Sequence, residues 1–345
     1  MRPPVDFAAR PASIGRMAKL PRILVLATGG TIAGEASARG LTGYDAGARA
    51  GDGLVAAVPG LDEVAGLNVE QVASIGSQDM TDAIQIALAR RLRTAFAKSE
   101  ADGAVIIHGT DTMEETAFLL DLLHDTDAPI VVTGAMRPAT ALSADGPANI
   151  RDAVTVAASP QARCRGVLIA MNGALHAARF ATKSDTADVG TFRSPLSGPV
   201  GHVDAAHLRF TAPPPGPRDV LPLPTTSLPR VDIVTAHAGM GGALIHASAA
   251  AGARGIVLAG VGGGNATRSA LKALSRATAA GIVCIRSTRV GSGFVNRNVE
   301  VDDDALGLVA SLDLNPPKAR VLAQLLIAAG ITEAAEIQAK FAANP

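Results

Sequence analysis

The 345-residue sequence contains no tryptophan, one tyrosine and two cysteines. Two cysteines cannot form a disulfide framework, and Cys164 and Cys284 lack metal-ligand spacing, so we expect two unreactive buried thiols. Lys plus Arg and Asp plus Glu both number 31, so no surplus charge points to nucleic acid or an anionic membrane. No apolar run approaches the roughly 20 residues that span a bilayer. We therefore expect neither a nucleic-acid partner nor a membrane partner.

The N-terminal residues are basic and rich in proline, and they lack the apolar segment of about 7–15 residues that a secretory signal peptide needs. We expect residues 1–21 to form a disordered arm, and the sequence leaves open whether translation starts at Met17. The absence of an apolar segment favours a cytoplasmic protein, and a periplasmic location is left open.

Short aliphatic runs recur along the first part of the chain and are bounded by Gly, Pro or polar residues. They lie at 23–27, 103–109, 129–134 and 166–171. Continuous runs of this length are typical of strands buried on both faces of a parallel sheet. Helical patterns over Asp82–Phe96 and Glu115–Leu123 lie between them. This alternation predicts a doubly wound α/β domain.

A proline-rich segment divides the chain, because seven prolines lie within residues 211–230. Neither a helix nor a central strand tolerates that density. We therefore predict a larger N-terminal catalytic domain over 22–212, a linker over 213–230 and a smaller C-terminal α/β domain over 231–345. The final helix is predicted around 317–329, ending at Gly330.

Open α/β sheets bind ligands at the carboxyl ends of their strands. The first strand ends in "TGGT", which matches neither the dinucleotide fingerprint nor the P-loop. Two interpretations stay open from the residues alone: a phosphate cradle of backbone amides, or a tight turn whose threonine caps the next helix.

A second strand end reads "HGTDTMEE". Thr112 and Glu115 fit a capping box, which leaves Thr110 and Asp111 as an exposed pair suited to a ligand amine. His108 is typical of a hydrogen-bonded core residue, and Lys183, judged alone, of a solvated surface lysine.

Taken together, the stretches "LATGGTIAG", "IGSQDM", "HGTDTMEETAFLLDL", "GAMRP" and "TKSDTADVGTF" resemble the bacterial L-asparaginases of the type II-like branch. In the second half, "AGVGGGN" and "LNPPKARVL" continue the resemblance. It runs from about residue 22 to the end of the chain.

The resemblance implies a hydrolase that converts L-asparagine and water to L-aspartate and ammonia without metal or cofactor. Thr31 would be the nucleophile, Tyr44 would lie on a lid above it, and a second hydroxyl would work in a relay with an acid and an amine. The catalytic residues it implies are Thr31, Tyr44, Thr110, Asp111 and Lys183. A covalent route and direct attack by water both stay open.

The resemblance also implies how a free amino-acid amide is held. Asp111 and Gln78 would take the ammonium, Ser77 the carboxylate, and the Ala135 carbonyl the side-chain amide. A neighbouring subunit's small domain would complete the pocket, in a homotetramer built as a dimer of dimers. The binding residues are Gly30, Gly76, Ser77, Gln78, Asp111, Ala135, Asn265 and Glu300.

Two other functions stay open. "GSGFVNRN" resembles the glutaminase-asparaginase branch, whereas "IGSQD" resembles the strict asparaginases. One methylene separates the two substrates and is worth only about 1–3 kcal/mol. A non-catalytic amino-acid-binding protein is the alternative from another class.

Overall fold

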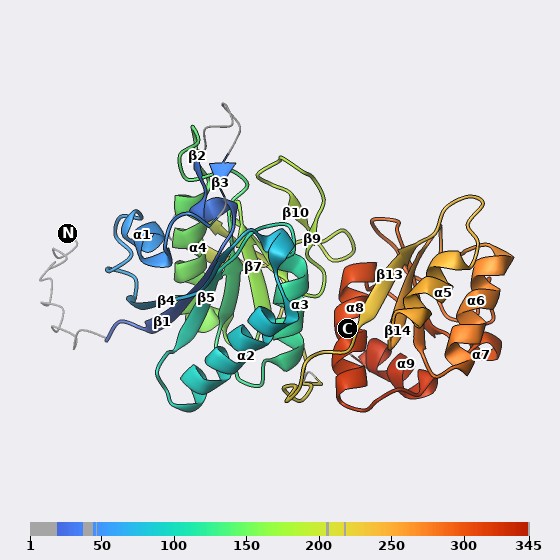
Figure 1. Cartoon of the computed structure of the whole chain (residues 1–345). Coiled ribbons are helices and arrows are strands. Elements are labelled where there is room, and N and C mark those ends of the chain that lie inside the picture. The colour runs from blue at the N-terminus through green and yellow to red at the C-terminus, as the bar shows by residue number, and fades with distance from the viewer. Residues whose placement is uncertain (1–18, 37–43, 46, 205–206, 217–218, 344–345) are drawn as a thin grey trace, which may run out of the picture.

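The computed structural model describes residues 19–36, 44–45, 47–204, 207–216 and 219–343 (Figure 1). Most of the predicted N-terminal arm lies outside these residues. Two α/β parts lie side by side, with the larger N-terminal part in blue to yellow-green and the smaller C-terminal part in gold to red. No helix among the described residues is long and apolar enough to cross a membrane.

The larger part is built on a sheet with strand order β12-β11-β8-β7-β6-β5-β1-β4. Neighbouring strands from β7 to β4 are parallel. The unbroken aliphatic runs predicted all of these strands except β4, whose sequence is interrupted by polar residues. These are β1 (Arg22–Gly29), β4 (Gly66–Ile75), β5 (Gly103–Ile107), β6 (Ile130–Thr133) and β7 (Val167–Met171). Three antiparallel strands extend the sheet, and the sequence patterns did not predict them: β8 (Ala174–Ala177), β11 (Gly201–Asp204) and β12 (His207–Phe210).

Helices cover both faces of this sheet, which confirms the doubly wound arrangement. Leu24 and Leu26 of β1 share one core with helices α2 (Asp82–Ala97) and α3 (Met113–Leu123). Ile23 and Val25 share the other core with α1 (Gly51–Ala56) and α4 (Gly146–Ala158). Successive side chains of a strand point to opposite faces, so one aliphatic run supplies both cores.

The smaller part has a four-stranded parallel sheet with order β13-β14-β15-β16. Its strands are β13 (Val231–Thr235), β14 (Gly255–Gly260), β15 (Val283–Thr288) and β16 (Val309–Ala310). Its helices are α5 (Ala243–Ala250), α6 (Arg268–Ala279), α7 (Asp303–Leu306), α8 (Pro316–Ala328) and α9 (Ala334–Ala343).

The predicted final helix is α8, and Gly330 follows it with φ of +82°. The prediction that it is the last helix is wrong, because α9 comes after it. Only Ile337 and Phe341 of α9 are buried. Two buried apolar residues make the helical hydrophobic pattern too weak to recognise in the sequence.

The two parts share a continuous apolar core, since α8 packs against both the small sheet and α3. Between β12 and β13, no helix or strand occurs among the described residues, as the prolines require. The exact domain boundaries stay a prediction.

The cysteines differ from each other. Cys284 is buried, and this burial raises the pKa of its thiol to about 12. Cys164 is exposed in a turn before β7, with φ of +60°, so the expectation of two buried thiols is wrong for Cys164.

Candidate active site

The turn after β1 contains two consecutive glycines, so its backbone carries no side chains there. Gly29 and Gly30 have φ of +103° and +85°, a region that favours glycine. A Cβ on Gly30 would lie 2.3 Å from the Gly109 Cα, so the turns after β1 and β5 touch through their backbones. Thr31 opens the short 3₁₀ helix η1 (Thr31–Ala33), whose N-cap is Gly30 with no side-chain cap bond. Thr31 is therefore not a helix cap.

Two residues of the turn after β5, Thr110 and Asp111, form a cluster with Lys183. The Lys183 Nζ donates to the Thr110 Oγ1 at 2.9 Å and to the Asp111 Oδ1 at 2.6 Å. Lys183 lies on β9 (Thr182–Lys183), which pairs with β10 (Phe192–Arg193). With 18% of its side chain exposed, it is not the solvated lysine expected from its residue type alone.

The cluster differs in one respect from the exposed Thr–Asp pair that was predicted. Thr110 is buried, whereas Asp111 remains exposed. A hydroxyl bonded to an amine can exchange a proton with it, and the adjacent carboxylate compensates the amine's charge. The Asp111 carboxylate also faces solvent, where it can meet a ligand cation.

A third loop lies against this cluster. The Asp111 amide donates to the Ser77 Oγ at 3.0 Å, and the Thr112 Oγ1 donates to the Ser77 carbonyl at 2.8 Å. The predicted capping box is therefore wrong: Thr112 makes no cap bond, because its hydroxyl binds the neighbouring loop. The Ser77 hydroxyl keeps its own proton for donation.

The loop before α2 also brings Gly76 and Gln78 to this edge of the sheet. Ser77 and Gln78 belong to the 3₁₀ turn η2 (Ser77–Asp79). The Gln78 side chain folds back over Gly76, where a Cβ would lie 2.4 Å from its amide atoms. Gln78 is exposed, so its amide can reach a ligand beside Asp111.

The loop that carries Ala135 is held by residues that the sequence analysis did not single out. The Asp145 carboxylate accepts from the Met136 and Arg137 amides at 3.0 and 2.9 Å. Asn149 donates to the Gly134 carbonyl at 2.9 Å. An aspartate directly before the Gly-Pro start of α4 was the available signal.

The backbone places Tyr44 near the first turn. It lies in β3 (Tyr44–Asp45), which pairs with β2 (Glu35–Ala36), and the Gly47 amide then donates to the Gly30 carbonyl at 3.1 Å. The Tyr44 side chain lies outside the described part of the chain, as do residues 37–43.

Asn265 and Glu300 meet in the smaller part, where the Asn265 amide donates to the Glu300 carboxylate. Both loops are fastened by Arg286, which is 1% exposed and pairs with Asp303. The Arg286 guanidinium also donates to the carbonyls of Gly263 at 2.7 Å and Asn296 at 2.9 Å. Sequence reasoning missed Arg286, because no motif marks a charged residue inside a buried strand.

His108 behaves as the predicted core residue. It is fully buried, its Nδ1 lies 2.6 Å from the Gly109 carbonyl oxygen, and burial lowers the pKa of its imidazole to about 4. Among the residues that the structure describes, no group of three or more His, Cys, Asp or Glu could hold a metal ion.

Comparison with known families identifies the class of protein to which this arrangement of residues belongs. The family model "Asparaginase, N-terminal" matches residues 22–216, and "Glutaminase/Asparaginase C-terminal domain" matches residues 230–341. Together they cover most of the chain. The protein therefore belongs to the asparaginase family.

Individual relatives agree over nearly their whole length. The "Probable L-asparaginase periplasmic" of Haemophilus influenzae is 45% identical, with 91% of each chain covered. "L-asparaginase 2" of Escherichia coli is 44% identical, covering 91% of this chain and 90% of the relative. Relatives called glutaminase-asparaginase also match, including one from Pseudomonas fluorescens at 39% identity, with 93% of this chain and 90% of the relative covered.

A solved structure shows the same fold. The "Probable Cytoplasmic L-asparaginase" of Campylobacter jejuni matches with a TM-score of 0.88 and 38% identity, over 94% of this chain and 99% of that one. The names of these relatives place them in different compartments, so the cytoplasmic location of this protein stays a prediction.

Proposed function

We propose that this family member hydrolyses L-asparagine to L-aspartate and ammonia, with Thr31 as the nucleophile. The observation that carries the proposal is the Lys183 amine bonded to both Thr110 and Asp111, beside the contact of Gly30 with Gly109. Thr31 directly follows Gly30 and Thr110 directly follows Gly109, so the contact between the two glycines brings the backbones of two hydroxyl-bearing residues close together. The names of the relatives support asparagine as substrate.

In the proposed reaction the Thr31 Oγ attacks the carboxamide carbon. A threonine hydroxyl is a weak nucleophile until a neighbouring group takes its proton. Thr110 and Lys183 form a path by which the proton that Thr31 gives up can reach the departing nitrogen. The C–N bond then breaks, which releases ammonia and leaves the aspartyl ester of Thr31. Water hydrolyses the resulting ester and restores the Thr31 hydroxyl. Positioned proton transfer of this kind contributes about 10²–10⁴ in rate.

The same residues explain how the substrate would be held. Its ammonium would meet the exposed Asp111 carboxylate and the Gln78 amide oxygen, and its carboxylate would accept from the Ser77 hydroxyl. The Ala135 carbonyl would accept from the substrate's amide N–H. Asn265 and Glu300 would come from a second copy, in a homotetramer of paired dimers.

Replacing the nucleophile tests the proposal. Thr31→Ala should abolish ammonia release while aspartate still binds, as measured by calorimetry. Thr31→Ser, which keeps the hydroxyl, is the matched control. Ammonia release by Thr31→Ala within tenfold of wild type would refute the nucleophilic role. Mass spectrometry of rapidly quenched wild-type enzyme tests the covalent route, because an acyl-enzyme carries added mass on the Thr31 peptide.

Glutamine hydrolysis is the second candidate, and the relatives called glutaminase-asparaginase favour it. A pocket discriminates against one extra methylene by only about 1–3 kcal/mol, roughly 10- to 200-fold. The ratio of kcat/KM for the two amides decides between strict and dual specificity. Ammonia release from either amide excludes a purely binding function.

A further inference from the structure

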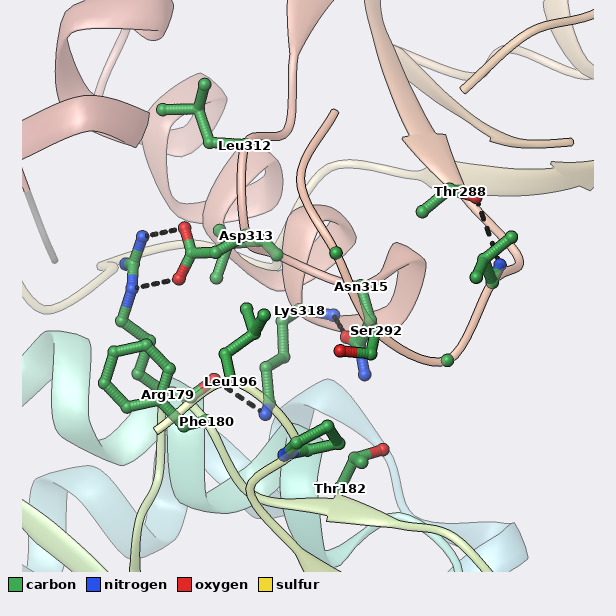
Figure 2. A pocket seen from close by; sticks show the side chains of 15 residues that line it. Arg179, Phe180, Thr182, Leu196, Thr288, Ser292, Leu312, Asp313, Asn315 and Lys318 are labelled. Atoms are coloured by element: carbon green, nitrogen blue, oxygen red, sulfur yellow. Dashed lines mark hydrogen bonds and ion pairs between the residues drawn. The ribbon is translucent and has the colours of Figure 1, made fainter. Parts of the chain in front are cut away.

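The two parts of the chain enclose a cavity that the proposed reaction does not use (Figure 2). Lys318, in the first turn of α8, lines it and is 2% exposed. A buried ammonium is costly unless charged or polar partners surround it. The partners of Lys318 therefore indicate what the residue is for.

Lys318 holds the strand that leads to the proposed catalytic lysine. Its Nζ donates to the Arg179 carbonyl at 2.8 Å and to the Ala181 carbonyl. β9, which carries Lys183, begins directly after Ala181. The two bonds thus fix the backbone two to four residues before the lysine that binds Thr110.

The other side of Lys318 faces the helix that follows Thr110 and Asp111. Its Nζ lies 3.9 Å from the Glu114 Oε2 in the first turn of α3, and Asn315 donates to that same oxygen at 3.3 Å. Lys318 therefore lies between the two segments whose side chains form the Lys183–Thr110 bond.

A buried ion pair also joins the segment before β9 to the segment before α8. Arg179 donates to both carboxylate oxygens of Asp313, at 2.8 and 2.7 Å (Figure 2). The pKa of Lys318 is lowered to about 8, chiefly by burial and in part by the charge of Arg179, while the carboxylates of Glu114 and Asp313 oppose the shift.

We propose that Lys318 is a positioning residue for the reaction: it holds β9 against the start of α3, so that Lys183 keeps its hydrogen bond to Thr110. This inference rests on the proposed function. Under this inference the smaller part of the chain helps to shape the active site of the same subunit, through Lys318, which does not touch substrate.

Arg320, also on α8, offers a matched control. Its guanidinium reaches across to Asp82 and Glu115, at 3.7 Å each, and binds the Val231 carbonyl. No described contact joins Arg320 to residues 179–183. A variant at this position weakens the same interdomain contact without releasing β9.

The test compares Lys318→Met with Arg320→Met in the full-length enzyme. We expect Lys318→Met to lower kcat by about tenfold or more with KM within about threefold, because small displacements of catalytic groups cost large factors in rate. We expect Arg320→Met to keep kcat within about twofold, even where it lowers the thermal midpoint. Equal kcat losses in the two variants would overturn the positioning role.

A double-mutant cycle asks whether Lys318 acts through Lys183. If it does, Lys318→Met should change the residual rate of Lys183→Met by less than about twofold, since interacting residues are not additive. A full additional loss would overturn the inference. A wild-type rate in Lys183→Met would instead refute the proposed function, whereas a loss there with none in Lys318→Met would refute only the positioning role.

A second variant keeps the test decisive if Lys318→Met does not fold. Glu114→Gln keeps an acceptor for Asn315 and removes the charge that faces Lys318. A fall in kcat relative to Arg320→Met supports the positioning role, and an unchanged kcat contradicts it.

Discussion

Lys183 and Thr110 are 73 residues apart in sequence, yet the lysine amine lies 2.9 Å from the threonine hydroxyl oxygen. The strand β9 brings the amine to the carboxyl end of β5, where Asp111 also binds it at 2.6 Å. An amine paired with both a hydroxyl and a carboxylate is suited to moving a proton and not only to balancing charge.

Removing this amine should therefore slow the chemical step. We expect Lys183→Met to lower kcat by about 10²–10⁴, the usual contribution of positioned acid–base catalysis. Lys98, exposed at the end of α2, provides the control, and Lys98→Met should leave kcat unchanged. Steady-state ammonia release measures both variants. A Lys183→Met enzyme with a normal kcat and a raised KM would assign the lysine to binding instead.

Gly30 gives a second prediction, because its Cα faces the backbone of Gly109. Gly30→Ala would place a Cβ 2.3 Å from the Gly109 Cα at a φ of +85°, and backbone atoms cannot yield as a flexible side chain can. We expect a large loss of activity, because the turns that carry Thr31 and Thr110 must separate. Gly53→Ala, in α1, is the control, since no atom lies within 4 Å of its added Cβ. Equal activity in the two variants would contradict the close approach.

The central strands β1, β5, β6 and β7 of the larger sheet could be predicted, because each buries both faces and so reads as an unbroken aliphatic run. The short strands could not. β9 and β10 have two residues each, and pairing with each other, not hydrophobic pattern, defines them. The position of Thr31 and Thr110 at strand ends followed from general α/β architecture.

Other parts of the site depend on tertiary contacts that no local pattern records. Lys183 was assigned by resemblance alone, since its partners are distant in sequence. Thr112 was misread as a helix cap, because the Ser77 carbonyl competes for its hydroxyl. No role was predicted for Lys318 or Arg286, because their burial is a property of the folded chain.

The buried pair of Arg286 and Asp303 gives a prediction about stability. Asp303→Asn leaves the guanidinium without its charge partner, and breaking such a pair costs about 3–5 kcal/mol. Asp304→Asn on the same helix removes an exposed partner of Arg297, a surface pair worth about 0–1 kcal/mol. Urea unfolding compares the two. The variant at Asp303 should also raise KM, because Arg286 fastens the loops of Asn265 and Glu300.

His176 gives a prediction about pH. It is buried beside Ser194, and burial, then the charges of His202 and Lys318, lowers the pKa of its imidazole to about 4. The unfolded chain, with a histidine pKa near 6.5, binds the extra proton between pH 6.5 and 4. Stability should therefore be full above pH 6.5 and fall as the pH drops toward 4, by up to about 1.4 kcal/mol per pH unit for this group.

The His176→Gln variant should make the free energy of unfolding less steep in pH over this window, as measured by urea titrations at several pH values. His246→Gln changes an exposed histidine and is the control. His108 contributes in the same direction, so the slope should decrease but not vanish. An unchanged slope in His176→Gln would show that this imidazole is already protonated in the folded state.

The pairing of Asn265 with Glu300 leads to a prediction about assembly. If Glu300 completes the site of a second copy, then Thr31→Ala and Glu300→Ala damage different halves of one pocket. Each variant alone should be nearly inactive. Co-expressed subunits should regain about a quarter of the wild-type sites, because random pairing in a two-fold interface produces half mixed dimers with one intact site each. Ammonia release by the unfractionated co-expressed enzyme measures this recovery, with separately purified and unmixed variants as the control. No recovery in proven mixed oligomers would place Glu300 outside the shared pocket.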